Sequence, residues 1–188
     1  AEPAGFRVVA QEFGYAGRPL PTFACRQPGN VNFLTGTAAP RASLRDLSHV
    51  APGCFQILDV LAPSECDQLV RITEQMGYDE DAPVSLPHSF RHMQNVNWIA
   101  DASIAELVWS RAAPVLPESA REVAPGAEAV GLNQRFRCYK YGAGDYFKPH
   151  TDGSWPGSAV VDGELVRDAF GDRWSQYTFL LLLSGEYE

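Results

Sequence analysis

The sequence of 188 residues predicts a mainly β domain with supporting helices, an α+β fold. Strand-like apolar segments lie at residues 54–61 and recur from residue 132 onward. Only two segments, beginning near residues 63 and 103, combine helical spacing of apolar residues with start and stop signals. A chain of this length suits one domain with a sizeable core, or one domain with an added arm.

Composition limits the possible partners. The formal net charge is −8, which argues against nucleic acid or an anionic membrane as the main partner. The longest apolar run, residues 179–183, is far shorter than the roughly 18 residues of a membrane span. Basic residues nevertheless cluster around one segment (Arg135, Arg137, Lys140 and Lys148). This cluster favours a small anionic molecule, so we expect a small-molecule or peptide substrate, and the sequence leaves the oligomeric state open.

The four cysteines form no C-x-x-C pair and no zinc-site spacing. Buried free thiols in a reducing compartment are the simpler prediction, which favours a cytoplasmic location over two disulfides. The chain begins at Ala1 without a signal-peptide core and ends at Glu188 directly after an apolar segment. Both ends are therefore expected to be cut from a longer protein.

Residues 1–50 are rich in Gly, Pro and Ala, with short apolar pieces and scattered aromatic residues. They are expected to form an N-terminal arm with one or two edge strands, or a partly ordered extension. Residues 51–188 are expected to form the main domain. It opens with a strand at 54–61 and a helix that Ser64 would cap, with Gly77 as the stop signal.

Residues 78–95 look like a loop because Pro83 and Pro87 interrupt any regular pattern. His88 and His92 are four residues apart and would share a face if the segment were helical, but the prolines argue against a helix. Arg91 and Asn95 are candidates to line a substrate groove, with an ordinary solvated loop as the alternative. A second helix is expected from Ser103, where Ser103-x-x-Glu106 matches a capping box.

The strand that follows Leu132 has two different faces. Phe136 and Cys138 point to one side, whereas the other carries Arg135, Arg137, Tyr139 and Tyr141. Such a polar face is either exposed to solvent or forms the wall of a ligand cavity.

After a glycine-containing turn, a second short strand is expected to end in His150-Thr151-Asp152. Residues two apart on a strand point the same way, so an imidazole and a carboxylate would lie side by side. They are two of the three groups in the 2-His-1-carboxylate site of non-haem Fe(II) oxygenases. Residues 155–174 are expected to form a loop, and residues 175–184 a strand buried on both faces.

The segment from Tyr141 to Asp152 resembles the Fe(II)/2-oxoglutarate-dependent dioxygenases of the prolyl 4-hydroxylase-like group. The shared features are a tyrosine nine residues before the histidine, a glycine turn, an aromatic residue and Pro-His-x-Asp. Residues 58–70 resemble the strand-to-helix entry of that group, and residues 178–184 the strand after the metal site. The resemblance covers roughly residues 54–188.

The resemblance implies a double-stranded β-helix, or jelly roll, with supporting helices. It implies Fe(II), 2-oxoglutarate and O2 as cofactors, with ascorbate as a further possibility, and a hydroxylase that acts on a prolyl or other amino-acid substrate. His150 and Asp152 would bind iron, and Tyr141 would hydrogen-bond 2-oxoglutarate, with Tyr139, Thr178 and Leu180 as further co-substrate contacts. The candidates for substrate contact are Arg91, Arg135, Arg137 and Trp155.

Two departures from the family pattern stand out. Leu182 lies near a position where many relatives carry a hydroxyl group, although Thr178 or Tyr177 could replace it. No histidine follows Asp152, so the family's second histidine and its Arg or Lys for 2-oxoglutarate are expected beyond Glu188, in C-terminal strands missing from this chain. The alternatives are a non-catalytic jelly-roll binding module without a complete metal site, and a cupin-like site that uses His88 or His92.

Overall fold

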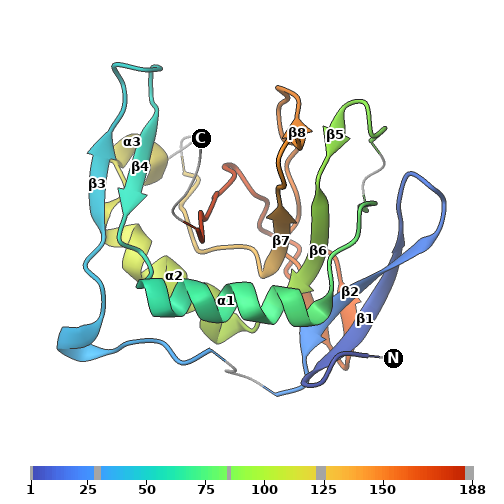
Figure 1. The fold of residues 1–188 in the computed structure, drawn as a ribbon. Helices are drawn as coiled ribbons and strands as arrows, with labels where there is room; N and C mark the ends of the chain where they lie inside the picture. The colour runs from blue at the N-terminus through green and yellow to red at the C-terminus, as the bar shows by residue number, and fades with distance from the viewer. Residues whose placement is uncertain (1, 28–30, 84–85, 122–125, 185–188) are drawn as a thin grey trace.

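The computed structural model describes residues 2–27, 31–83, 86–121 and 126–184. Strands and helices alternate along the chain, and Figure 1 shows helix α1 lying across the sheet strands. In chain order the elements are β1 (Phe6–Phe13), β2 (Pro19–Cys25), η1 (Gly36–Ala38), β3 (Ser43–Asp46), β4 (Phe55–Leu58), α1 (Pro63–Met76), β5 (Arg91–His92), β6 (Gln94–Ile99), α2 (Ala102–Ala112), η2 (Ala113–Val115), α3 (Glu118–Arg121), β7 (Arg135–Lys140), β8 (Tyr146–Phe147), β9 (Ala159–Val161) and β10 (Glu164–Val166).

The main sheet has four strands in the order β1-β2-β6-β7. β1 pairs antiparallel with β2, β2 parallel with β6, and β6 antiparallel with β7. Three further strand pairs, β3-β4, β5-β8 and β9-β10, form small sheets of their own. The mainly β, α+β class expected from the sequence is therefore what the structure has.

One face of the main sheet is apolar and packs against the helices. Phe23 and Trp98 from the sheet join Leu69 of α1 and Ile104 and Val108 of α2 in one buried cluster. Phe136 and Cys138 of β7 pack against the same cluster, on the face predicted for them. Burial of side chains of this size stabilises the fold by about 1.5–3 kcal/mol each. Helices α1 and α2 therefore cover the apolar face of the main sheet, and the opposite face remains available for contacts with other segments.

The opposite face is covered in part by the hairpin β9-β10. Val160 and Leu165 of the hairpin pack on Val9 and Ile99 of the sheet. The prediction of a loop over residues 155–174 is therefore wrong at this hairpin. Its turn is Asp162-Gly163, where φ is 50° and 89°, as two-residue hairpin turns require. Asp-Gly between two apolar pairs was the sequence signal for it.

Residues 6–25 belong to the main sheet. β1 lies at its edge, and β2 lies between β1 and β6. The buried Glu12 carboxylate fastens this segment to β7, because its Oε2 atom accepts from Arg135 Nη2 at 2.6 Å and from Thr22 Oγ1 at 2.7 Å. Further along, β3 pairs antiparallel with β4 across residue 50. Two parts of the first fifty residues thus pair with later elements, β2 with β6 and β3 with β4.

The caps of both helices differ from the predicted ones. Ala62, not Ser64, is the N-cap of α1, and Glu65 Oε2 accepts from the Ala62 backbone N–H at 2.8 Å. Asp101, not Ser103, caps α2 by accepting from the Ser103 N–H at 3.0 Å. In each helix the cap lies before the predicted residue, because Pro63 suits the first helical turn and an aspartate caps as well as a serine. Gly77 ends α1 with a φ of 84°, as predicted.

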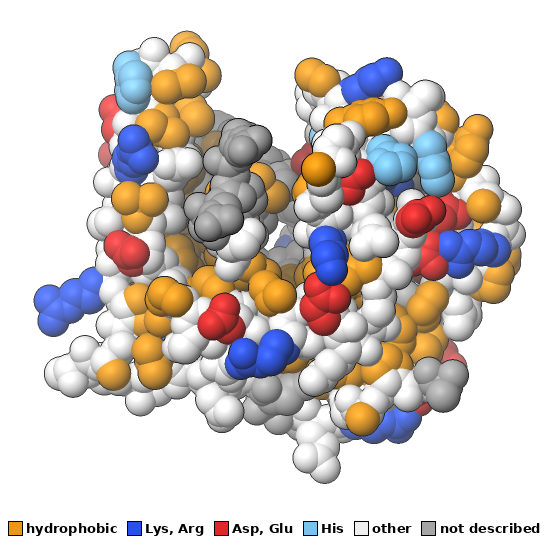
Figure 2. All heavy atoms as spheres, viewed as in Figure 1, with side chains coloured by type: hydrophobic (Ala, Val, Ile, Leu, Met, Phe, Trp, Pro, Cys, Tyr) orange, Lys and Arg blue, Asp and Glu red, His pale blue; other side chains and the backbone are white. Residues whose placement is uncertain are grey.

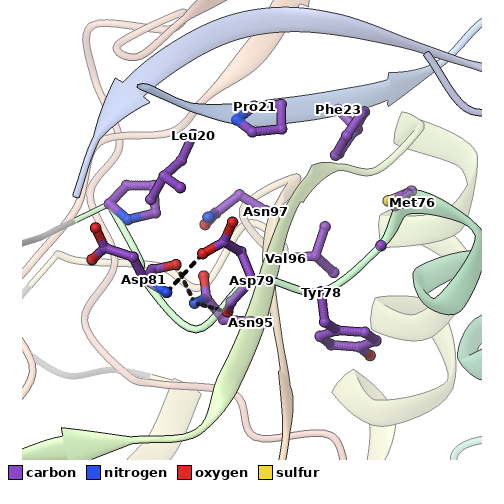
Figure 3. A pocket seen from close by; sticks show the side chains of 12 residues that line it. Leu20, Pro21, Phe23, Met76, Tyr78, Asp79, Asp81, Asn95, Val96 and Asn97 are labelled. Atoms are coloured by element: carbon purple, nitrogen blue, oxygen red, sulfur yellow. Dashed lines mark hydrogen bonds between the residues drawn. The ribbon is translucent and has the colours of Figure 1, made fainter. Parts of the chain in front are cut away.

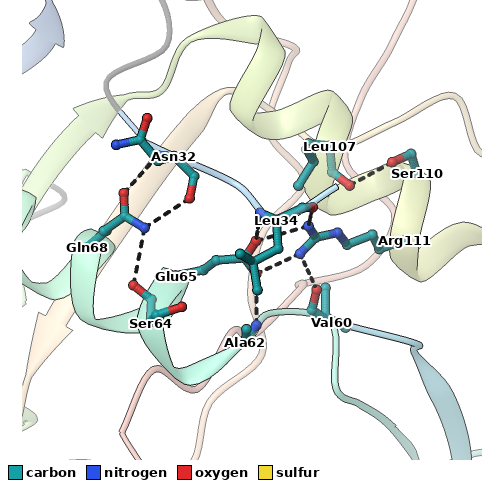
Figure 4. Close-up of polar contacts among 10 residues, drawn as sticks. All are labelled: Asn32, Leu34, Val60, Ala62, Ser64, Glu65, Gln68, Leu107, Ser110 and Arg111. Atoms are coloured by element: carbon teal, nitrogen blue, oxygen red, sulfur yellow. Dashed lines mark hydrogen bonds and ion pairs between the residues drawn. The ribbon is translucent and has the colours of Figure 1, made fainter. Parts of the chain in front are cut away.

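A buried ion pair joins α1 to α2 (Figure 4). Arg111 donates to both oxygens of the fully buried Glu65, at 2.7 and 3.0 Å. The same guanidinium also donates to the Val60 and Leu34 carbonyls, at 3.0 and 2.8 Å. Because every charge in this network has partners, it holds the two helices and residue 34 in one arrangement.

Two predictions about the later strands are wrong in part. The loop expected over residues 78–95 contains β5 and the start of β6, an interior strand whose alternating Asn-Val-Asn-Trp pattern was a readable signal. Residues 175–184 form no strand within the described chain, and the segment is not buried on both faces. Leu181 and Leu183 pack on the core, whereas Leu180 and Leu182 are 72% and 53% exposed. Alternation of this kind is typical of an extended segment with one covered face.

All four cysteines lie in the described part of the chain, and all are free thiols of intermediate burial. Among the described residues, no helix combines the length and the apolar character that crossing a membrane requires.

Candidate metal centre

His150 and Asp152 lie side by side, as the sequence predicts, although the strand that was expected to carry them is shorter. β8 ends at Phe147, and residues 148–152 are not part of a strand. Pro149 explains the early end, because it has no N–H to donate to a neighbouring strand. His150 Nε2 is nonetheless 3.4 Å from Asp152 Oδ1, and the two side chains are 30% and 54% exposed. The irregular backbone thus keeps the pair together and open to solvent.

The imidazole of His150 is fixed by two contacts. Its Nδ1 atom is 2.7 Å from the Lys148 carbonyl oxygen, and its ring stacks on Phe147 with centroids 3.7 Å apart. A carbonyl oxygen can only accept, so Nδ1 carries the hydrogen of this bond. In the neutral ring Nε2 then has its lone pair directed to the side of Asp152. A backbone carbonyl on the far nitrogen is the usual way in which proteins orient a metal-binding histidine.

The carboxylate of Asp152 is oriented in a matching way. Its Oδ2 atom accepts from the Thr178 hydroxyl at 2.5 Å, which leaves Oδ1 facing His150. Thr178 is a predicted co-substrate contact, and in the structure its hydroxyl donates to the predicted metal ligand Asp152. The extended segment after residue 175 therefore supports the aspartate.

This donor pair fits a divalent cation such as Fe(II). A neutral imidazole nitrogen and a carboxylate oxygen are both ligands of non-haem iron. His150 Nε2 and Asp152 Oδ1 are 3.4 Å apart, close enough for one cation to contact both. Among the described residues, however, no group of three His, Cys, Asp or Glu side chains is arranged to hold a metal. The described chain thus supplies two ligands of the expected three.

His88 and His92 belong to a different cluster. The two rings meet edge to face with centroids 6.1 Å apart, and His92 stacks on Tyr146. His92 Nδ1 is 2.6 Å from Asp145 Oδ1, so its nearest carboxylate is in the glycine turn rather than at Asp152. Neither histidine forms a metal-binding group with His150 and Asp152 within the described residues. A cupin-like site that uses them therefore has no support in this arrangement.

Arg91 and two tyrosines form one wall beside the pair. Arg91 is 7% exposed, and its guanidinium lies over the Phe147 ring at 5.6 Å, on the ring that also stacks on His150. Burial lowers the pKa of Arg91, the nearby Tyr139 raises it, and Arg137 lowers it. Burial and Tyr139 raise the pKa of Tyr141. The Tyr141 hydroxyl is therefore protonated at neutral pH and able to donate a hydrogen bond.

The two arginines of β7 have different surroundings. The Arg135 side chain is 4% exposed and is paired with Glu12, which makes it part of the fold. The guanidinium of Arg137 lies over the Trp155 ring at 4.6 Å, and that of Arg135 lies 5.7 Å from the same ring. Asn97 is the cross-strand neighbour of Arg137 in β6. The polar face of β7 is thus covered by other side chains at Arg135 and Arg137 rather than fully exposed to solvent.

Two further predicted contacts have different surroundings. Leu180, a predicted co-substrate contact, is 72% exposed. Asn95, a groove candidate, is 4% exposed and donates to the Asp79 and Asp81 carbonyls at 3.0 and 2.7 Å. Asn95 therefore holds the chain after α1 in place. Phe147 was not predicted as a site residue, since strand alternation would have turned it away from His150.

A pocket of about 250 Å³ lies between β2, β6 and the segment after α1 (Figure 3). Its acidic residues are already engaged in the fold. Asp81 accepts from the Tyr15 and Ala16 N–H groups at 2.8 and 2.9 Å, and Asp79 accepts from Arg18. His150 and Asp152 do not line this pocket. Figure 2 also shows a hollow between the β3-β4 pair and the side of the molecule that carries β7 and β8.

Comparison with known proteins leaves the family open, because no family model, no curated protein and no solved structure matches the chain.

Proposed function

We propose that the chain carries the metal site of an Fe(II)- and 2-oxoglutarate-dependent oxygenase with a jelly-roll fold, which hydroxylates an unactivated C–H bond of a prolyl or other amino-acid substrate. In this reaction one oxygen atom of O2 enters the new hydroxyl group. The other enters succinate, formed from 2-oxoglutarate with release of CO2. The electrons thus balance without a further reductant in each productive turnover.

The observation that carries the proposal is the orientation of the His150–Asp152 pair. Each side chain is fixed from behind, by the Lys148 carbonyl and the Thr178 hydroxyl, so that its remaining donor atom faces the other. If the pair served only the stability of the fold, a direct hydrogen bond between His150 and Asp152 would stabilise it more. Two supported donors 3.4 Å apart suit a shared cation better.

The proposed roles follow from this orientation. His150 Nε2 and Asp152 Oδ1 hold iron, and a third protein ligand is required from outside the described residues. Bound iron with 2-oxoglutarate supplies the oxidising chemistry, while the protein positions the substrate carbon. Tyr141 donates a hydrogen bond to 2-oxoglutarate, and the covered polar face of β7 borders the site.

The competing proposal is a non-catalytic binding module. It is favoured by the absence, among the described residues, of a third side chain that could complete the metal group. In that case His150 would be protonated and would form a simple ion pair with Asp152. The two proposals differ in whether the protein binds a divalent cation at all.

The experiment uses the protein expressed from its complete reading frame. Incubation with Fe(II), O2 and 2-oxoglutarate is expected to release succinate, and a panel of peptides and free amino acids should contain members that accelerate it. A protein that binds neither Mn(II) nor 2-oxoglutarate by calorimetry would contradict the enzyme and support the binding module.

Tyr141→Phe tests the co-substrate role. Loss of one hydrogen bond to a charged group costs about 1.5 kcal/mol or more, so the Kd of 2-oxoglutarate is expected to rise about tenfold. Because Tyr141 is half exposed, the melting temperature should hardly change. An unchanged Kd would assign the role to another residue.

A further inference from the structure

Arg137 is a cation with no anion beside it. Among the described residues no side-chain hydrogen bond or ion pair of Arg137 is present, and its Nη2 atom is buried without a partner. Its one described contact is the Trp155 ring, 4.6 Å from the guanidinium carbon. A guanidinium that loses contact with water without gaining a partner is costly to bury.

Other arginines of the molecule show how such a charge is normally satisfied. Arg135, two residues earlier on the same face of β7, pairs with Glu12 at 2.6 Å. Arg111 has a carboxylate and two carbonyls as partners. Arg173 stacks on Phe170 at 4.4 Å, much as Arg137 stacks on Trp155, yet it also pairs with Asp172 at 2.8 Å. Arg135 Nε is also buried without a hydrogen bond, but of these four arginines Arg137 alone has no ion-pair partner among the described residues.

Arg137 is linked to the ligand pair through Trp155, the ring on which its guanidinium stacks. Trp155 follows Asp152 by three residues, a span of at most about 11 Å. Both ends of that span are anchored to one segment, since the Trp155 N–H donates to Ser175 Oγ at 2.9 Å and Thr178 donates to Asp152. Trp155, which carries the stacked guanidinium, and Asp152 are thus both anchored to residues 175–178.

The ring of Trp155 also restricts which ligand the guanidinium can bind. With one face of Arg137 covered by the indole, its in-plane N–H groups are left for a partner. Planar N–H groups match the two oxygens of a carboxylate. Arg91 is a second cation nearby, and Arg137 contributes to lowering its pKa.

We propose that Arg137, held flat against Trp155, binds the carboxylate of a small organic acid next to the His150–Asp152 pair. This inference deepens the proposed function and rests on it for the identity of the neighbouring site. The carboxylate has two possible sources, which are a free amino-acid substrate and 2-oxoglutarate itself. In the first case the protein selects free acids over peptides.

The test measures acid binding without added metal, by calorimetry on the protein expressed from its complete reading frame. The probes are free L-amino acids, their carboxamides and 2-oxoglutarate. Arg137→Gln is expected to weaken binding of the acid at least tenfold. The matched control is Arg173→Gln, which removes a stacked arginine from an exposed position and should leave binding within twofold. Arg137→Lys keeps the charge without the planar N–H pair and should give an intermediate loss, and melting curves show whether each variant is folded.

The two sources give different results. If wild type prefers amino acids to their carboxamides and Arg137→Gln removes the preference, the carboxylate belongs to the substrate. If only 2-oxoglutarate binds more weakly, it belongs to the co-substrate. The inference is overturned if no acid binds, or if folded Arg137→Gln and Arg137→Lys bind every acid as wild type does.

Mn(II) binding to the same variants keeps the two proposals apart. Normal Mn(II) binding with acid affinity independent of Arg137 would reject this inference alone. Absent Mn(II) binding with acid affinity dependent on Arg137 would reject the oxygenase and leave an acid-binding site.

Discussion

The molecule contains two histidine–aspartate pairs, and they are built in opposite ways. In the pair His92–Asp145, Nδ1 of the histidine meets the carboxylate directly at 2.6 Å, and Asp145 Oδ2 accepts from the Gly142 N–H at 2.8 Å. In the pair His150–Asp152 the facing atoms are 3.4 Å apart. The hydrogen bonds of these two side chains are made to other groups, the Lys148 carbonyl for His150 and the Thr178 hydroxyl for Asp152.

The difference shows that residue types alone do not define a metal site. His92 Nδ1 and Asp145 Oδ1 contact each other directly and tie β5 to the turn after β7, so the two facing atoms of this pair are already engaged. His150 and Asp152 are supported by Lys148 and Thr178, so one donor atom of each remains available. We therefore propose a structural role for the first pair and a ligand role for the second.

The largest expected effect comes from removing either proposed ligand. His150→Ala and Asp152→Ala should each abolish 2-oxoglutarate turnover, because each removes an iron ligand. His92→Ala is the matched control and should retain turnover, since its ring serves the fold. Succinate formation by the protein from its complete reading frame measures all three. Succinate production by His150→Ala would contradict the ligand assignment.

A smaller effect is expected from the group behind the aspartate. Thr178→Val removes the hydroxyl that orients Asp152 while it keeps the shape of the side chain. Loss of such a supporting contact typically weakens metal affinity by about 10–100-fold. Thr178→Ser keeps the hydroxyl and should bind Mn(II) nearly as wild type does. Equal affinity in Thr178→Val and wild type would show that Thr178 does not orient the ligand.

The smallest effect concerns the structural pair. The Gly142 N–H and then His92 hold the pKa of Asp145 below its ordinary value. A lowered pKa in the folded state stabilises the protein above about pH 4, the ordinary value for aspartate, and this contribution is lost as the pH falls through the folded value. The melting temperature of wild type should exceed that of Asp145→Asn near pH 6, and the gap should close towards pH 3. A gap that is the same at both pH values would contradict this role.

The fold could be predicted where local sequence carries the information. The stop of α1 at Gly77 and the two faces of β7 follow from residue types and spacing, and both agree with the structure. β6 was missed because two prolines upstream suggested a loop, although the strand lies inside the sheet and buries its asparagines against neighbours far away in sequence. The alternating pattern of β6 was readable locally, but the distant strands that cover its asparagines were not.

The candidate site shows the same limit. Its two central residues could be placed side by side from a spacing of two, yet β8 ends before them and the backbone is irregular there. The Lys148 carbonyl and the Phe147 stack arise from that irregularity, so alternation along a strand could not have predicted them. Arg135 has an ion-pair partner and Arg137 does not, because Glu12, more than a hundred residues earlier, pairs with Arg135.

The most direct test of the central claim is Mn(II) binding, followed by electron paramagnetic resonance, to the protein from its complete reading frame and to its His150→Ala and His92→Ala variants. We predict one bound Mn(II) in wild type and in His92→Ala, and none in His150→Ala. Retention of Mn(II) by His150→Ala, or its loss in a folded His92→Ala, would contradict the assignment of the two pairs.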